Sequence, residues 1–301
     1  MPSLNKLIFS MLLSAIVCGK IYAAVAYVRM RGENRKHLHW LIADAVGIGY
    51  IIGYLLLEKN PTFPPKEGFE WLFYFAIIAI ISSTFWDSSR KQRLITQFIY
   101  SVAIPRILLD NSYFRHDWGV MEGMIWWVCL ALGIFTVWNI VEQSFSALPS
   151  GASVAFVYFG LSGATALVLA LTSTLRLAQH AGIVAALFGA IWFVTLVLKR
   201  VVKNVSESDW HILPLSLSPI VVFLLVGIWM NGYFFNYVPS ICVLLLAVAP
   251  IFALVGGIQV IQRLGDRKSL FVQIGLIVLC VGVAVVIAVM RSGLFGQSTN
   301  Y

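Results

Sequence analysis

Ionisable side chains inside long apolar runs are the first candidates for chemistry in this sequence. Lys20 lies within the apolar run 7–28, and Asp44 lies near the start of the run 40–57. If both runs are antiparallel helices, Lys20 lies about 12 Å and Asp44 about 6 Å from the same end of the pair. We therefore expect a Lys20–Asp44 ion pair. It would either tie the first helical hairpin or form part of a substrate or proton pathway, because ionisable groups in membranes often mark such pathways.

A second candidate lies in the stretch SVAIPRILLD, residues 101–110. Arg106 and Asp110 are four residues apart, which places them on one helix face where they can form an ion pair. Pro105 has no backbone N–H and crowds the carbonyl four residues earlier, so it is expected to loosen or kink the helix. Two interpretations stay open: a surface-seeking arginine with a local partner, or a kinked helix that opens a polar pocket for an anionic group.

The same apolar run carries a polar stripe. Arg93, Gln97 and Ser101 recur at intervals of four residues and therefore share one helix face. Arg106 does not fall on this face unless the proline rotates the helix. We predict two separate polar features on one helix.

One short motif resembles a known catalytic arrangement. Residues 160–163 read GLSG, and His180 follows before Ala181 and Gly182. This resembles the serine–histidine dyad of rhomboid intramembrane proteases, with Ser162 as the implied nucleophile. In that family another span separates the two motifs, whereas here they lie on consecutive runs. Glycine and serine packing between helices explains the motif better.

No other residue set indicates catalysis, metal binding or a cofactor. The histidines divide between the two expected sides of a membrane, and the cysteines lie singly in apolar runs without CxxC spacing; they are His37, His39, His116, His180, His211, Cys18, Cys129, Cys242 and Cys280. Nucleotide-binding, HExxH and EF-hand patterns are absent from the sequence. We predict no catalytic residues, no metal site and no cofactor, so the chain is more consistent with a non-enzymatic protein.

The amino-acid composition indicates that this chain is surrounded by lipid. Of its 301 residues, 60% are hydrophobic and 11% are charged, whereas a soluble domain carries roughly 25% charged residues. The net charge of +8 comes from short groups between apolar runs, not from one basic face of the kind that binds nucleic acid. We therefore predict an all-α polytopic integral membrane helix bundle that contacts the lipid bilayer and does not bind nucleic acid.

The apolar runs predict about ten transmembrane helices within a single domain, residues 1–301. They are approximately 7–28, 40–57, 71–86, 94–109, 121–141, 153–175, 181–198, 216–235, 240–261 and 270–290. Lysine and arginine gather in alternate loops, around 29–36, 90–93, 199–203 and 263–268. The positive-inside rule places these loops in the cytoplasm and both termini outside, in a plasma (inner) membrane.

The ten runs divide into halves, residues 1–148 and 149–301. Five spans in each half would give an inverted repeat, which is common in secondary transporters. Pro105 in the fourth run and Pro250 in the ninth occupy similar places in the two halves and are expected to kink their helices.

Small residues recur at four-residue spacing. Gly49 and Gly53 share one face of the second run, and Gly189 and Gly257 lie on similar faces in the seventh and ninth. Such faces allow close helix packing. They are expected to serve packing within the bundle; alternatively, they serve a homodimer or a partner membrane protein.

These features favour a secondary-type transporter of a small solute or ion. The alternative is a non-catalytic membrane subunit or scaffold that binds partner helices, supported by the small-residue faces. An intramembrane serine protease is a remote alternative that rests on the GLSG motif alone.

Overall fold

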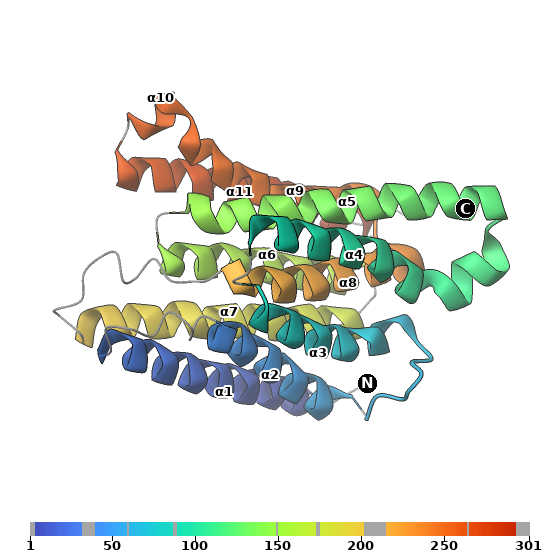
Figure 1. The fold of residues 1–301 in the computed structure, drawn as a ribbon, viewed down its shortest axis with the longest axis horizontal. Coiled ribbons are helices and arrows are strands. Elements are labelled where there is room, and N and C mark those ends of the chain that lie inside the picture. Colours follow the sequence, from blue (N-terminus) through green and yellow to red (C-terminus); the bar gives the residue numbers. More distant parts are fainter. Residues whose placement is uncertain are drawn as a thin grey trace.

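The computed structural model describes residues 4–31, 40–58, 60–86, 89–148, 150–172, 175–201, 215–263 and 265–292. Within these ranges the chain is helical and contains no strand, which confirms the predicted fold class (Figure 1). The elements are α1 (Leu4–Arg31), α2 (Trp40–Leu57), η2 (Gly68–Glu70), α3 (Trp71–Thr84), α4 (Arg90–Leu109), η3 (Asp110–Asp117), α5 (Val120–Ala147), α6 (Gly151–Leu171), α7 (Leu175–Val201), η5 (Leu215–Leu217), α8 (Ser218–Asn236), α9 (Ser240–Val248), η6 (Ala249–Gly257), α10 (Gln259–Gln262) and α11 (Asp266–Arg291).

Eight segments of the described chain are long and apolar enough to cross a membrane. They are Asn5–Val28, Trp40–Leu57, Val120–Ala147, Gly151–Leu171, Leu175–Val201, Leu215–Asn236, Ser240–Gly257 and Arg267–Arg291. The third predicted span corresponds to a shorter apolar helix, Gly68–Thr84. The fourth, α4, is less apolar because the polar stripe and Arg106 interrupt it. The chain is a multi-pass membrane protein, but the predicted count of ten spans is not confirmed.

The outer surface of the bundle is apolar. Leu132 on α5 is 59% exposed, Leu279 on α11 is 66% exposed and Phe193 on α7 is 63% exposed. Large apolar side chains at this exposure are disfavoured in water but match the hydrocarbon of a bilayer. These faces therefore contact lipid.

Helix α8 forms the centre of the bundle. Nearly all of its side chains are buried, and it packs against α2, α3, α5, α7 and α9. An apolar helix in a membrane can be covered by lipid or by other helices, and α8 is covered by other helices. In Figure 1 the other helices run back and forth beside it along the long axis.

Glycines of α2 let three helices approach closely. A Cβ added at Gly49 would lie 2.5 Å from Leu187 of α7 and 3.3 Å from the carbonyl oxygen of Ser14 in α1. At Gly53 it would lie 2.5 Å from the Ser14 hydroxyl. The Gly49–Gly53 face is therefore occupied by α1 and α7 and is not free for a homodimer.

The other two predicted packing glycines differ from each other. A Cβ at Gly189 would lie 3.2 Å from the Phe159 ring of α6, whereas a Cβ at Gly257 would meet no atom within 4 Å. Gly189 thus lies at a close helix contact, as expected. Gly257 does not, because it ends η6 beside open space.

The ninth span is not one continuous α-helix. Helix α9 ends at Val248, and Ala249–Gly257 continue as a 3-10 helix in which Pro250 occupies the first turn. Proline has no N–H to donate, so the α-helical bond at this position is lost. The predicted kink at Pro250 appears as a change of helix type, whereas Pro105 lies within α4, which continues to Leu109.

Candidate functional sites at the two ends of the bundle

Polar side chains gather at two opposite ends of the helices. The end of the bundle where α2 ends and α7 begins is called the Glu58 end. The end where α3 ends and α4 begins is called the Glu142 end. The positive-inside rule predicts that the Glu58 end lies outside the cell and the Glu142 end in the cytoplasm.

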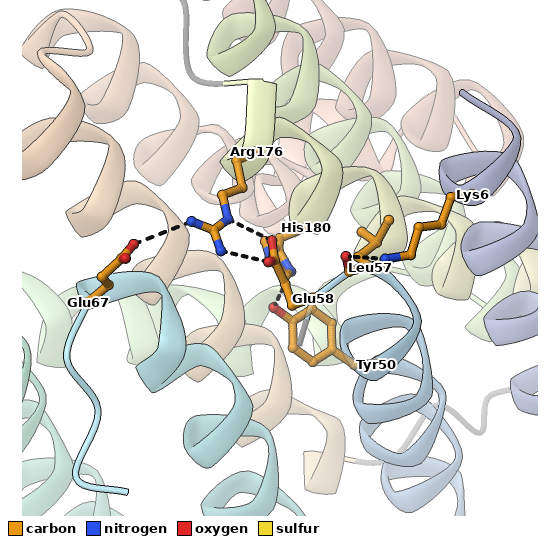
Figure 2. Close-up of polar contacts among 7 residues, drawn as sticks. All are labelled: Lys6, Tyr50, Leu57, Glu58, Glu67, Arg176 and His180. Atoms are coloured by element: carbon orange, nitrogen blue, oxygen red, sulfur yellow. Dashed lines mark hydrogen bonds and ion pairs between the residues drawn. The ribbon is translucent and has the colours of Figure 1, made fainter. Parts of the chain in front are cut away.

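At the Glu58 end, one arginine binds two carboxylates. Arg176, in the first turn of α7, donates through Nε and Nη2 to the two Glu58 oxygens at 2.8 and 2.7 Å. Its Nη1 donates to Glu67 at 3.3 Å, and its Cζ lies 3.7 Å from the centroid of the Phe69 ring. Figure 2 shows the contacts of Arg176 with Glu58 and Glu67. The two parallel bonds to Glu58 form the strong, directional type of arginine–carboxylate pair.

His180 continues this network into the bundle. It lies one turn after Arg176 on α7 and is fully buried. Its Nε2 lies 3.6 Å from Glu58 Oε1, and its Nδ1 lies 3.2 Å from the Tyr50 hydroxyl (Figure 2). The Tyr54 ring centroid is 5.1 Å from the imidazole centroid. The groups form a continuous row from the exposed Glu67 to Tyr50, which is fully buried.

Glu58 is ionised in this setting. Burial opposes its negative charge, but the contacts with Arg176 and His180 outweigh burial and lower the pKa of Glu58 to about 2. The carboxylate therefore stays charged at neutral pH and holds Arg176 in place.

Backbone and side-chain bonds fix the loop that covers this cluster. Glu70 accepts hydrogen bonds from the Lys66 N–H at 2.8 Å and from the Thr62 hydroxyl at 2.9 Å. Asn231 of α8 donates to the Gly68 carbonyl at 3.2 Å. Lys6 of α1 donates to the Leu57 carbonyl at 3.0 Å (Figure 2). The loop is thus attached to the central helix α8, and the end of α2 is attached to α1.

At the Glu142 end, α4, α5 and η6 surround a polar cavity of about 730 Å³. Its lining includes Arg90, Arg93, Asn139, Glu142 and Gly257. The Nε atom of Arg93 lies 3.5 Å from a Glu142 oxygen, which also accepts a 2.9 Å hydrogen bond from the Trp86 indole. The lining therefore contains two arginines and one carboxylate, a net charge of +1.

The polar stripe on α4 leads inward from this cavity. Gln97 and Ser101 follow Arg93 at one-turn intervals, and both are fully buried. Neither polar atom of the Gln97 amide, nor the Ser101 hydroxyl, has a hydrogen-bond partner within the described parts of the chain. A buried polar group without a partner costs about 1–3 kcal/mol. Two such groups therefore follow in succession on the helix whose first turn lines the cavity.

The structure does not form the predicted Lys20–Asp44 pair. Lys20 is exposed on the outside of α1, and Asp44 is buried and accepts a 3.3 Å hydrogen bond from Ser83 of α3. The cause is helix rotation: Cys18 faces Gly49, so Lys20, two positions later, points away from α2. A role for either residue in a pathway stays a prediction without this pair.

The Arg106–Asp110 pair forms as predicted. Its nitrogen and oxygen lie 3.1 Å apart, and the Arg106 guanidinium carbon lies 4.7 Å from the Phe114 ring centroid. The Arg106 side chain is 51% exposed, so both partners are local and the pair is a surface feature. A pathway role for this pair also stays a prediction.

The GLSG motif does not assemble with His180. The two ring nitrogens of His180 face Tyr50 of α2 and Glu58, the residue after α2. The Ser162 hydroxyl is buried and has no partner among the described residues. The geometry therefore gives the protease alternative no support. In the described ranges, no three His, Cys, Asp or Glu side chains gather as a metal-binding group.

The network at the Glu58 end was missed by sequence reasoning. Its signal was present as spacing: Tyr50, Tyr54 and Glu58 recur every four residues along α2 and the residue after it, as Arg176 and His180 do on α7. No protein-family model, curated protein or solved structure matches this chain. The functional interpretation therefore rests on the geometry of the two ends.

Proposed function

We propose that this chain is a secondary-type transporter of a small solute or ion, located in the plasma membrane with both termini outside. The buried, unpartnered stripe on α4 carries the proposal. In a membrane bundle, buried polar groups often mark a route for water or solute. Gln97 and Ser101 lie one and two turns further along α4 than Arg93, which lines the cavity at the Glu142 end.

The arrangement of helices supports the same proposal. Within residues 1–148, α1 packs on α2, α2 on α3 and α4 on α5. Within residues 149–301, α6 packs on α7, α7 on α8, and α9 with η6 on α11. The same order of neighbours in both halves is what a five-plus-five repeat requires. The cavity borders the fourth span of one half and the 3-10 segment of the ninth.

Cysteine accessibility tests the route directly. Cys18, Cys129, Cys242 and Cys280 are replaced by alanine, and Gln97→Cys or Ser101→Cys is introduced. The matched control is Ile99→Cys, because Ile99 lies between them on α4 but is exposed on the outer surface. A membrane-impermeant thiol reagent should modify the stripe cysteines at least about tenfold faster than Ile99→Cys, since lipid excludes water.

Transport itself is measured on proteoliposomes challenged with panels of organic anions, amino acids, sugars and inorganic ions. We expect a flux that Gln97→Leu removes. Stripe cysteines that react as slowly as Ile99→Cys, together with no flux for any panel member, would contradict the proposal.

A second candidate function has its own observation. An apolar groove of about 590 Å³ lies between α6 and α11, and Gly160, Gly163 and Gly282 line it. A Cβ added at any of these glycines meets no atom within 4 Å. Such a surface suits a partner transmembrane helix, as a scaffold would require. Replacement of Gly163 by leucine would then abolish partner binding and leave any solute flux unchanged.

A further inference from the structure

The row of groups at the Glu58 end has the form of a proton-binding site. We propose that His180 binds the proton that is coupled to solute transport. The proton enters and leaves from the solvent at the Glu58 end, past the Glu58 carboxylate. The link between this proton and solute transport rests on the proposed function. Proton binding by His180 can be tested without any solute.

The two ring nitrogens of His180 have different surroundings. Nδ1 lies 3.2 Å from the Tyr50 hydroxyl, which can donate or accept. Nε2 is buried and has no hydrogen-bond partner in the described chain, and the nearest charged atom is Glu58 Oε1 at 3.6 Å. The neutral ring carries one N–H proton, which points either from Nε2 to Glu58 or from Nδ1 to the Tyr50 oxygen. An incoming proton adds to the other nitrogen and gives an imidazolium whose two N–H groups face Glu58 and Tyr50; its release reverses the step.

The surrounding charges favour binding of one positive charge. On α2, His180 faces Tyr50, Tyr54 and Glu58. On α7 and the covering loop, Arg176 lies between Glu58 and Glu67. Two carboxylates against one guanidinium leave one negative charge, which an imidazolium at His180 would neutralise.

The other charged groups of the neighbouring elements have hydrogen-bond partners of their own. Glu70 of η2 bonds the Lys66 N–H and Thr62, and Lys6 of α1 bonds the Leu57 carbonyl. Helices α6 and α8 contain no charged residue within Gly151–Leu171 and Ser218–Asn236. Tyr158 is the titratable side chain of α6 and Tyr233 that of α8, and Tyr158 bonds Ser144 of α5.

The division of labour within the row follows from its geometry. Arg176 holds both Glu58 oxygens, so Glu58 remains a fixed anion beside Nε2 and guides a proton without storing it. His180 stores the proton, because its neutral ring has one nitrogen that carries no proton. Tyr50 lets the ring keep a hydrogen bond in both protonation states by turning its O–H.

The first test measures protonation directly in the full chain. His37, His39, His116 and His211 are replaced by asparagine, and histidine labelled with ¹³C at Cε1 reports on the ring that remains. We expect one resonance that moves with pH between about pH 4 and pH 9. It should disappear in His180→Gln, which assigns it. A resonance that stays fixed over this range would show a permanently neutral or charged structural histidine and would overturn the proposal.

The second test separates proton coupling from transport. In proteoliposomes, His180→Gln should lose solute accumulation driven by a proton gradient but keep solute exchange at equal pH. Tyr50→Phe, which preserves the ring and its packing, should weaken accumulation in the same direction. Full proton-driven accumulation by His180→Gln would overturn the inference. If the wild-type chain neither accumulates nor exchanges any solute while the His180 resonance titrates, the transporter proposal fails and the proton site stands.

Discussion

The two ends of the bundle contain similar residue types but use them differently. At the Glu58 end, Arg176 grips both oxygens of one carboxylate and contacts a second. At the Glu142 end, Arg93 approaches Glu142 through one nitrogen at 3.5 Å, and the amide behind it has no partner in the described chain. Bidentate pairing fixes structure, whereas unmatched polar groups beside a cavity leave capacity for a ligand. The two ends therefore differ in how many of their buried polar groups have hydrogen-bond or charge partners.

The largest expected effect comes from removing the arginine of the fixed end. Arg176→Leu leaves Glu58 charged and largely covered without its partner, so we expect a loss of about 2–3 kcal/mol in the free energy of unfolding. The loss is at the low end of the range for buried pairs because Arg176 is half exposed. Denaturant unfolding in detergent measures it. Arg176→Lys should lose less stability than Arg176→Leu. An unchanged stability in Arg176→Leu would show that Arg176 does not stabilise this end of the bundle.

A glycine pair compares the packing of the two ends. A Cβ at Gly68, near the Glu58 end, would lie 2.4 Å from the Asn231 amide oxygen, whereas a Cβ at Gly257, near the Glu142 end, meets nothing within 4 Å. We expect Gly68→Ala to cost about 1–2 kcal/mol and Gly257→Ala to change stability by less than about 0.5 kcal/mol. Thermal unfolding of both variants decides the point. Equal losses would contradict the difference in packing.

The smallest expected effect has the opposite sign. Gln97→Leu removes a buried amide that has no partner in the described chain, so stability should stay unchanged or rise by up to about 1 kcal/mol. The matched control is Gln273→Leu on α11, because Gln273 donates to the Ala253 carbonyl at 2.9 Å and its loss should destabilise. If Gln97→Leu destabilises as much as Gln273→Leu, Gln97 is a structural residue and the stripe is not a route.

Features that depend on local spacing were predictable from the sequence. The continuous apolar character of residues 216–235 predicted a span, and α8 forms the buried centre. The four-residue spacing of Arg106 and Asp110 predicted their ion pair, which forms. The stripe of Arg93, Gln97 and Ser101 was also visible, since helix periodicity alone places these residues together.

Features that depend on helix rotation or long-range packing were not predictable. Glu58 and Arg176 lie 118 residues apart, and no local pattern indicates that the ends of α2 and α7 meet. The Lys20–Asp44 prediction failed because depth alone does not define which face a residue occupies; the Gly49–Gly53 contact sets that rotation. The change to a 3-10 helix after Val248 also depends on packing, because proline permits several outcomes in a membrane helix.

The 3-10 winding of η6 affects how the ninth span fits the bilayer. A span of 18 residues, Ser240–Gly257, reaches only about 27 Å as a uniform α-helix, slightly less than the hydrocarbon thickness of about 30 Å. A 3-10 helix rises about 2.0 Å per residue. Nine residues wound in this way extend the span to roughly 31 Å. The proline-induced winding thus relieves hydrophobic mismatch without a longer chain, and local thinning of the membrane is not required.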